Sequence, residues 1–339
     1  MHQTAFVTGA TGLLGYSLVR TLLARNYRVV ALSRCAAKAQ RQFPGLPVEH
    51  VVGDMQDVDG FAAHLKNVDV VFHAAACFRD SYKGGSHRDE LMRTNVDATR
   101  ALLDATIAQG VRRWVQISSI AVLDGPPGQV INETMRRDVH DADDYYLSKI
   151  LCDQVVESFL AQVPSLWATF ILPGWMHGPG DAGPTSAGQL VRDHLRRQVP
   201  VVPPGTVSLV DARDVALAAV MANERGQRGE RYLAAGRHMT LRDLLSDLAQ
   251  VTGIPAPRLA MPHSLMRIMA AVGEWRARRW GHPLLISTAT VKLMAREHDR
   301  TRFDPRKSEL ALGLRFRPLH DTLRDEVAWL RQHTMGAPS

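Results

Sequence analysis

Lysine, cysteine and long apolar runs are all scarce in this chain of 339 residues. Its three cysteines are odd in number and lack the spacing of a metal site, so we expect free thiols, a reducing cytoplasm and no bound metal. No run of 18 or more apolar residues is present, which predicts no membrane-spanning helix. The first residues run into an apolar, strand-like segment without the parts of a signal peptide, which also favours a cytoplasmic location.

Positive charge is in excess, with a net charge of +7 and a pI near 9.6. Such a balance favours an anionic cofactor, acidic substrates or an anionic surface. Only six of the 41 basic residues are lysines, so the excess reads as a preference for arginine along the whole chain. No basic region, zinc finger or aromatic-studded basic sheet is present, and we expect no nucleic-acid partner.

Short apolar runs alternate with helical patterns over the first half of the chain. The strands expected are 5–7, 28–32, 48–52, 68–73, 114–118 and 168–172, and the helices are roughly 12–25, 88–110 and 143–162. Strands separated by helices imply βαβ units and a parallel sheet covered on both faces. The sequence therefore predicts an α/β fold with a doubly wound, Rossmann-type parallel sheet.

After Pro173 the pattern becomes mainly helical with isolated short strands. Glycine and proline are frequent over 173–205, as in a long loop over a site, and helices are expected at 240–252, 263–280 and 318–332. We predict a cofactor-binding domain over 1–172 and a smaller, mostly helical substrate lobe over 173–339. The second span leaves open a return of the chain to the first sheet for a strand or helix.

A glycine-rich turn joins the first expected strand to the first helix, in the order G-x-x-G-x-x-G. Gly9 permits the sharp turn, Gly12 lets the backbone approach a pyrophosphate, and Gly15 allows close packing of helix on strand. The amino end of the helix then faces the phosphates. We expect a nucleotide site here, although a glycine triplet also fits an ordinary tight turn.

The end of the second strand selects between the two nicotinamide cofactors. An acidic residue there would hold a ribose hydroxyl, whereas an arginine accommodates a 2′-phosphate. The chain has Ser33 and Arg34 there, followed by Lys38, and no carboxylate. We therefore expect NADP(H) rather than NAD, with Arg34 as the phosphate clamp; the alternative is an arginine in solvent at a strand end.

A Tyr–Lys pair lies in the helix expected over 143–162. Tyr145 and Lys149 are four residues apart, so they share one helical face. A free phenol has a pKa of about 10, and a nearby ammonium lowers that pKa by favouring the phenolate. The pair can thus exchange a proton with a substrate oxygen, although a Tyr–Lys pair also occurs by chance on solvated helices.

Together these segments resemble the extended short-chain dehydrogenase/reductases over nearly the whole chain. The matching motifs are Thr8 to Gly15, Val52-Gly53-Asp54, His73 to Ala76, Thr94-Asn95-Val96, Ile117-Ser118-Ser119, Tyr145 to Lys149 and Leu172 to Gly180, with Arg302 to Leu314 and Trp329-Leu330 near the end. The stretch 117–122 looks most like dihydroflavonol reductases, 3β-hydroxysteroid dehydrogenases and their bacterial relatives. Leu172 and the Trp175-Met176-His177 stretch depart from the usual pattern, which speaks against a nucleotide-sugar substrate.

The resemblance implies roles for four catalytic-site residues: Tyr145, Lys149, Ser119 and Asn95. Tyr145 would be the general acid in reduction and the general base in oxidation, with Tyr146 as its rival. Lys149 would lower the phenol's pKa and bind the nicotinamide ribose. Ser119 would hydrogen-bond the substrate oxygen, with Ser118 as the alternative. Asn95 would hold a water or fix the helix near Lys149, or would be a buried amide bonded to backbone.

The resemblance and the strand-end positions also give two wider sets of contacts. The cofactor set is Gly9, Thr11, Gly12, Leu13, Leu14, Gly15, Ser33, Arg34, Lys38, Asp54, Met55, Ala74, Ala75, Ala76, Asn95, Lys149, Pro173, Gly174 and Met176. The substrate set is Phe78, Arg79, Tyr82, Trp175 and His177. For Trp175, Met176 and His177, packing between the two lobes is the competing interpretation.

The hypothesis favoured by these features is an NADPH-dependent reductase of a carbonyl on a hydrophobic small molecule, or the reverse alcohol oxidation. A nucleotide-sugar epimerase or dehydratase and a non-enzymatic NADP-binding sensor are the alternatives. Helices 88–110 and 143–162 are those that relatives pair in a homodimer, which we also expect. The arginine-rich segment 266–280 suits either an anionic membrane or partner helix, or a solvated arginine face over a core stripe, and we favour the latter.

Overall fold

The structure, a computed structural model, describes residues 2–78, 87–183, 185–260, 262–280, 291, 295–297 and 299–333. A parallel sheet of seven strands forms its centre, in the order β3-β2-β1-β4-β5-β6-β9. The strands are β1 (Thr4–Thr8), β2 (Arg28–Ser33), β3 (Val48–Val52), β4 (Val70–His73), β5 (Arg113–Ile117), β6 (Trp167–Pro173) and β9 (Arg231–Ala234). The strand order reverses between β1 and β4, which confirms the predicted doubly wound fold and places its ligand crevice between them.

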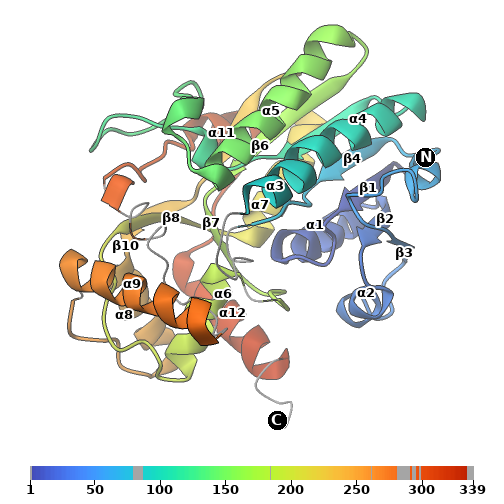
Figure 1. The fold of residues 1–339 in the computed structure, drawn as a ribbon. Coiled ribbons are helices and arrows are strands. Elements are labelled where there is room, and N and C mark those ends of the chain that lie inside the picture. Colours follow the sequence, from blue (N-terminus) through green and yellow to red (C-terminus); the bar gives the residue numbers. More distant parts are fainter. Residues whose placement is uncertain are drawn as a thin grey trace.

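Apolar side chains on both faces of the sheet explain why these strands are nearly continuous apolar runs. The neighbours Phe6 and Val7 are both fully buried, yet they belong to two different core clusters. One cluster includes residues of α4 (Ala98–Ala108) and α5 (Asp144–Gln162). The other includes residues of α1 (Leu13–Ala24) and α7 (Ala212–Arg225). Figure 1 shows these two helix pairs on either side of the sheet.

The helix predicted over 88–110 is interrupted. It consists of α3 (Arg88–Leu91), a π-helical segment (Met92–Asp97) and α4. A π-helical segment inserts an extra residue per turn and often marks a functional site. The prediction of one continuous helix was therefore wrong in its middle turns, where Asn95 lies.

The second half of the chain returns to the first sheet. β9 pairs in parallel with β6, and α7 packs against α1. α11 (Arg306–Leu312) contacts α7 and β9 in turn. A boundary at residue 172 therefore does not divide the chain into two units that are continuous in sequence.

The C-terminal lobe has its own core beneath a small sheet in the order β10-β8-β7. Its strands are β7 (Trp175–His177), β8 (Thr206–Asp211) and β10 (Arg237–Thr240). Its helices are α6 (Ser186–Leu195), α8 (Leu241–Thr252), α9 (His263–Trp280) and α12 (Leu319–His333), so the helices predicted over 240–252, 263–280 and 318–332 are observed. The short strands expected in this lobe are joined in one three-stranded sheet, and the rest of the lobe is mostly helical as predicted.

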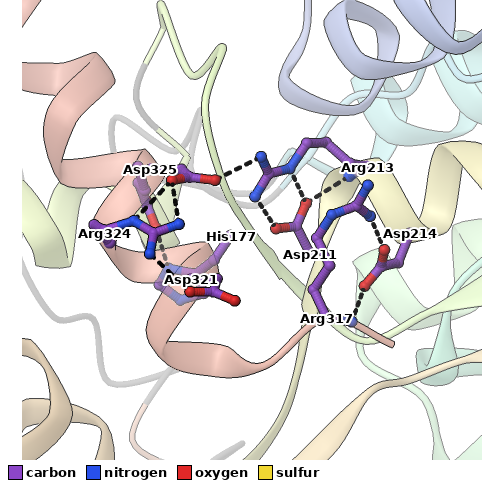
Figure 2. A network of polar contacts seen from close by, with 9 residues as sticks. His177, Asp211, Arg213, Asp214, Arg317, Asp321, Arg324 and Asp325 are labelled. Atoms are coloured by element: carbon purple, nitrogen blue, oxygen red, sulfur yellow. Dashed lines mark hydrogen bonds and ion pairs between the residues drawn. The ribbon is translucent and has the colours of Figure 1, made fainter. Parts of the chain in front are cut away.

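A network of ion pairs joins α12 to the junction of β8 and α7 (Figure 2). Arg213 donates to both oxygens of Asp211 and, at 2.8 Å, to Asp325 of α12. Hydrogen bonding to Asp211 is the main cause that raises the pKa of the Arg213 guanidinium. The Arg317 backbone donates to Asp214 at 2.7 Å, and the same two residues also form an ion pair. Because α7 lies on the large sheet, this network ties the lobe to it.

The remaining elements are short. They are α2 (Ala36–Gln42) and the 3-10 turns Ala62–Leu65, Ile120–Val122 and Val139–Asp141. Within the described ranges, no helix combines the length and the apolar character needed to cross a lipid bilayer.

Candidate active site

The glycine-rich turn lies at the carboxyl edge of the large sheet, directly after β1. Gly9 has a φ of +66°, and a Cβ there would lie 2.8 Å from the Ala75 backbone nitrogen. A Cβ on Gly15 would meet the Gly9 carbonyl oxygen. Any side chain would fill this space, so the glycines keep an open cradle between β1, β4 and α1.

The amino end of α1 opens into that cradle. Its N-cap is the exposed Gly12, which contributes no side-chain hydrogen bond, and the first turn has no acidic residue. Thr11 is half-buried beside it, whereas the Leu13 and Leu14 side chains are buried. The predicted contact from Leu13 and Leu14 can therefore come only from their backbone amides, which suit an anionic group.

Thr8 and His73 clamp the ends of β1 and β4 together. The Thr8 hydroxyl accepts hydrogen bonds from the backbone amides of Ala74 and Ala75, at 3.1 and 3.0 Å. It lies 2.9 Å from His73 Nδ1, and His73 Nε2 lies 2.8 Å from the Thr99 hydroxyl. Ala74 and Ala75 are half-buried and Ala76 is exposed at this edge.

These contacts fix the protonation of the His73 ring. With two amides donating to it, the Thr8 hydroxyl donates its own proton to His73 Nδ1, which therefore accepts. Nε2 then carries the proton and donates to Thr99, whose hydroxyl donates at 2.7 Å to the Asn95 carbonyl. Burial, with a further contribution from the Lys149 charge, lowers the pKa of His73 to about 3. The ring is thus neutral and structural.

The side chains expected to determine the specificity for NADP(H) or NAD lie at the end of β2. Arg34 is exposed one residue beyond the strand, and Lys38 is half-buried on α2. Ser33 is buried, and its hydroxyl donates to the Cys35 carbonyl at 3.3 Å. The loop after β7 reaches the same place, because a Cβ on Gly183 would lie 3.6 Å from Lys38 Nζ. Arg34 and Lys38 thus offer positive charge at the sheet edge.

The residues after β3 divide between solvent and core. Asp54 is exposed, and one of its carboxylate oxygens accepts from the Gln56 backbone amide at 2.9 Å. Met55, in contrast, is 8% exposed and packs in the core cluster of α4 and α5. The Met55 side chain points into the core, so the predicted contact of Met55 with the cofactor can come only from its backbone.

Tyr145 and Lys149 lie on the first two turns of α5. The helix begins where Asp143 caps it by accepting from the Tyr146 amide at 2.9 Å. Lys149 is 4% exposed, and its ammonium donates to the Ile117 carbonyl at 3.0 Å, at the end of β5. One of its three N–H groups is used there, so the charge is anchored to the sheet edge with donors to spare.

The two neighbouring tyrosines face different surroundings. Tyr145 is 8% exposed, and its ring meets the Phe78 ring edge-on at 4.8 Å between centroids. Tyr146 instead lies under the Arg137 guanidinium, 4.8 Å from its ring centroid. Tyr145 is thus directed to the segment after β4, where the crevice opens.

The two adjacent serines after β5 also differ. The Ser118 hydroxyl donates to Asp153 at 2.7 Å, and Asp153 forms a buried ion pair with Arg231 at 2.9 Å. Burial raises the pKa of the Asp153 carboxyl, while Arg231 and Ser118 oppose this rise. Ser119 is half-buried, and its oxygen accepts from the Ala121 amide at 3.1 Å. That bond leaves the Ser119 proton for another acceptor, which favours Ser119 over Ser118.

Asn95 bridges the loop after β4 and α5. Its oxygen accepts from the Cys77 amide at 2.7 Å, and its amide nitrogen donates to the Cys77 carbonyl and the Ser148 hydroxyl, both at 3.0 Å. The Ser148 hydroxyl donates in turn to the Tyr145 carbonyl at 2.8 Å. Both amide protons are therefore used within the protein, and Asn95 fixes the backbone around Tyr145 rather than donating to a ligand.

The segment after β6 is shaped by packing between the two sheets. Pro173 is buried at the end of β6, and a Cβ on Gly174 would lie 2.5 Å from the Ala235 oxygen and 2.6 Å from the Ser208 oxygen. Met176 is half-buried against the core of α1 and α7. A strand-to-strand approach thus accounts for Gly174 without any ligand.

Trp175 and His177 take different positions along β7. Trp175 is half-buried, and its indole nitrogen donates to the Ser186 hydroxyl at 3.0 Å. His177 is fully buried, with Nδ1 2.9 Å from Glu326 of α12, which is also buried. The placement of His177 in a substrate wall is corrected, because its side chain is enclosed between β7 and α12.

The other predicted substrate residues are only partly covered. Phe78 is 38% exposed beside Tyr145, whereas Arg79 and Tyr82 lie outside the described residues. Within the described ranges, no group of three His, Cys, Asp or Glu side chains could hold a metal ion. The side chains of Thr8 and Asp153 were not predicted. Thr8 directly precedes Gly9 in the motif, whereas nothing local in the sequence marks Asp153.

The fold and site together define a Rossmann-type α/β protein with a glycine cradle and a Tyr–Lys pair at one edge of its sheet. Residues 5–235 match the model of the NAD dependent epimerase/dehydratase family, and the chain belongs to that family. This confirms the resemblance to extended short-chain dehydrogenase/reductases. The chain is therefore an oxidoreductase-type enzyme of a family that binds a nicotinamide dinucleotide.

Three similar proteins illustrate the match. Sterol demethylase protein B of Methylococcus capsulatus is 33% identical, covering 98% of this chain and all of that protein. A Synechocystis sp. protein provisionally named dihydroflavonol 4-reductase is 32% identical, covering 98% of this chain and 96% of that one. The crystal structure of gox2253 is 31% identical with a TM-score of 0.83, covering 98% of this chain and 99% of that one.

Proposed function

We propose that this enzyme is an NADPH-dependent carbonyl reductase that acts on a ketone or aldehyde of a hydrophobic small molecule, or on the corresponding alcohol in reverse. The observation that carries the proposal is the placement of Tyr145 beside an anchored Lys149. Tyr145 belongs to one apolar cluster with Ala121, whose backbone amide donates a hydrogen bond to Ser119. A proton donor, a fixed cation and a second hydroxyl donor therefore meet at the carboxyl edge of the sheet.

The glycine cradle is suited to the cofactor. A Cβ at Gly9 or Gly15 would collide with backbone, so the space between β1, β4 and α1 admits close approach of a pyrophosphate to the α1 amino end. When bound, NADPH supplies a hydride to the carbonyl carbon of the substrate. Thr8 and His73 hold the Ala74 and Ala75 backbone against this cradle, so they act by positioning it.

Residues of the protein transfer the proton and stabilise the charge that its transfer leaves. The Tyr145 hydroxyl donates its proton to the oxygen of the substrate carbonyl as negative charge develops there. The Lys149 ammonium, fixed on the Ile117 carbonyl, stabilises the phenolate that remains. The Ser119 hydroxyl donates a hydrogen bond to the same substrate oxygen. In alcohol oxidation the Tyr145 phenolate takes the proton back.

The proposed choice of NADPH over NADH rests on Arg34. It is exposed just beyond β2, with Lys38 nearby on α2, and no carboxylate stands at the strand end to bind a ribose hydroxyl. A guanidinium forms two parallel hydrogen bonds to a phosphate, which a lysine does not. Asp54, exposed after β3, is the proposed acceptor for the adenine amino group.

Replacing Arg34 by alanine tests that choice. We expect Arg34→Ala to weaken NADPH binding on the order of 10- to 100-fold, the worth of a charge-assisted hydrogen bond, and to leave NADH binding nearly unchanged. Arg41→Ala is the matched control, because Arg41 is exposed on α2 but lies in its last turn. Titration calorimetry with both cofactors measures the effect, and equal losses for NADPH and NADH would rule out a 2′-phosphate clamp.

The proposed substrate is apolar because the described wall beside Tyr145 is aromatic. The ring of Phe78, 38% exposed, meets the Tyr145 ring edge-on there. The test is an NADPH-oxidation screen against aldehydes, ketones, hydroxysteroids and flavonoid-like ketones, with Tyr145→Phe as the blank. Net NADPH oxidation supports the reductase. Turnover of nucleotide sugars without net oxidation would identify an epimerase or dehydratase instead.

We also propose that the enzyme forms a homodimer through α4 and α5. These helices lie side by side on one flank of the large sheet (Figure 1). Light scattering of the purified protein gives the mass directly, and a monomer at all concentrations would contradict the proposal.

A further inference from the structure

Helix α9 has apolar side chains on two opposite faces. Met266 and Ala270 are fully buried and form a small core with Val291. Ile268, Val272 and Trp275 are 61%, 50% and 58% exposed. Buried and exposed apolar groups thus alternate along one helix, contrary to the expectation of a single core stripe beneath a solvated arginine face.

Helical geometry shows that the exposed residues form one stripe. With 3.6 residues per turn, positions 268, 272, 275 and 279 fall within about 60° of one another around the helix axis. Positions 266 and 270 fall on the opposite side, about 160° to 200° from position 268. The exposed stripe is therefore not the edge of the core face. It is a second apolar surface, and the exposed Arg279 adds a positive charge at its end toward the helix C-terminus.

The charge of α9 complements an anionic surface. Its 18 residues include four arginines and one glutamate, a formal charge of +3 within a chain of +7. Positions 276 and 278 flank the stripe by about 80° on either side. A second copy seated on this stripe would bring the same positive charges together, which disfavours self-association here.

From this stripe and this charge we propose that α9 docks on a membrane surface rich in anionic lipid. In that arrangement the helix lies in the plane of the interface, with Ile268 and Val272 among the acyl chains and Trp275 at the headgroup level, a depth that tryptophan prefers. Arg279, exposed at the end of the stripe, then contacts the anionic headgroups and contributes on the order of 1 kcal/mol. α9, orange in Figure 1, lies in the C-terminal lobe on the side of the molecule away from β3 and α2, so docking leaves the glycine cradle uncovered.

Co-sedimentation with vesicles tests this directly. We expect the full chain to bind vesicles of equal parts phosphatidylcholine and phosphatidylglycerol, to bind pure phosphatidylcholine vesicles much more weakly, and to be released by high salt. Val272→Asp should lower the bound fraction on the order of tenfold or more, because it places a charge in the apolar stripe. Arg279→Glu should also weaken binding. Leu310→Asp is the matched control and should bind as wild type, since Leu310 is 86% exposed on α11.

Three results would overturn the proposal. They are equal binding to both vesicle types, no binding to either, and loss of binding in Leu310→Asp as severe as in Val272→Asp. A dimer that Val272→Asp converts to monomer in light scattering would assign the stripe to a second copy instead. Val272→Ser serves as a second variant, and unchanged NADPH affinity of both variants shows that the fold and the cofactor site are intact.

Discussion

The carboxyl edge of the large sheet and the outer surface of the C-terminal lobe hold their charged groups in different ways. At the sheet edge, the Asp153–Arg231 pair is formed by side chains only 4% and 8% exposed. Along α12, the Arg324–Asp321 pair is formed by side chains 56% and 42% exposed (Figure 2). Water stabilises the exposed charges of Arg324 and Asp321 in any arrangement. The buried charges of Asp153 and Arg231 are stabilised only by their protein partners.

This difference explains why the two regions suit different tasks. A buried network allows one arrangement of Ser118, Lys149 and the β5 end, which a proton donor beside a substrate needs. The exposed ion pairs on the outer surface of the lobe restrict the positions of neighbouring side chains very little. This surface can therefore bind a partner or a substrate without disturbing the carboxyl edge of the large sheet. Changes that break each kind of contact should therefore have unequal effects.

The largest expected change in stability comes from removing Asp153. Asp153→Ala removes one of the two carboxylate partners of the buried Arg231 guanidinium, Glu157 at 3.2 Å remaining, and leaves the Ser118 hydroxyl without its acceptor, which should lower the free energy of unfolding by about 3 kcal/mol. Arg324→Ala on α12 is the comparison and should cost about 1 kcal/mol or less. Urea unfolding measures both. Similar losses in the two variants would show that burial does not separate the two regions.

A smaller loss is expected from Thr8→Val, which keeps the shape and removes the hydroxyl. Two backbone amides and His73 Nδ1 then lack their hydrogen-bond partner, at a cost of about 2–3 kcal/mol in unfolding free energy. Thr8→Ser keeps the hydroxyl and should therefore retain most of the unfolding free energy and the NADPH affinity of wild type. If the valine variant matched the serine variant in urea, the clamp would have no energetic role.

Acid should destabilise the enzyme through His73. Its pKa is about 3 in the folded protein and 6.5 when unperturbed, so the unfolded state binds the extra proton between these values. Stability is therefore complete above about pH 6.5 and falls as the pH drops, by about 2 kcal/mol between pH 7 and pH 5.

The matched variant for this effect is His73→Gln, which keeps an acceptor for Thr8 and a donor for Thr99 but does not titrate. Asp153 and Asp181 have raised pKa values, so their protonation stabilises the folded state as the pH falls, opposite to the effect of His73. Both residues are present in wild type and in His73→Gln, so their contribution cancels in the comparison. Urea unfolding at pH 7, 6 and 5 should give a steeper loss for wild type than for His73→Gln. Parallel slopes would exclude His73 as the source.

The sequence alone predicts those elements whose formation depends on residues that are close together along the chain. The first six strands and α5 were predicted because the strands are short segments rich in apolar residues, and a helix needs only its own periodicity. The glycine turn was recognised because backbone sterics act locally. β9, four residues long, could not be distinguished from a loop, since its partner β6 lies some sixty residues earlier.

Contacts between distant residues could not be predicted. His177 was placed near substrate because nothing in the sequence shows that Glu326, 149 positions later, encloses it. Met55 follows a strand end but turns into the core, and the π-helical segment around Asn95 is not encoded by periodicity. The sequence shows apolar residues on two faces of α9. Which of the two faces is buried depends on the distant residues that pack against the helix, and these cannot be identified from the sequence.

The most direct test of the proposed mechanism compares two adjacent tyrosines. Tyr145→Phe removes the proposed proton donor, whereas Tyr146→Phe removes a hydroxyl from a ring that lies under Arg137. With any carbonyl substrate found in the screen, single-turnover NADPH oxidation by Tyr145→Phe should fall by about 10²- to 10⁴-fold with NADPH affinity unchanged, and Tyr146→Phe should stay near wild type. Wild-type turnover in Tyr145→Phe, or an equal loss in both variants, would contradict the assignment of Tyr145 as the acid.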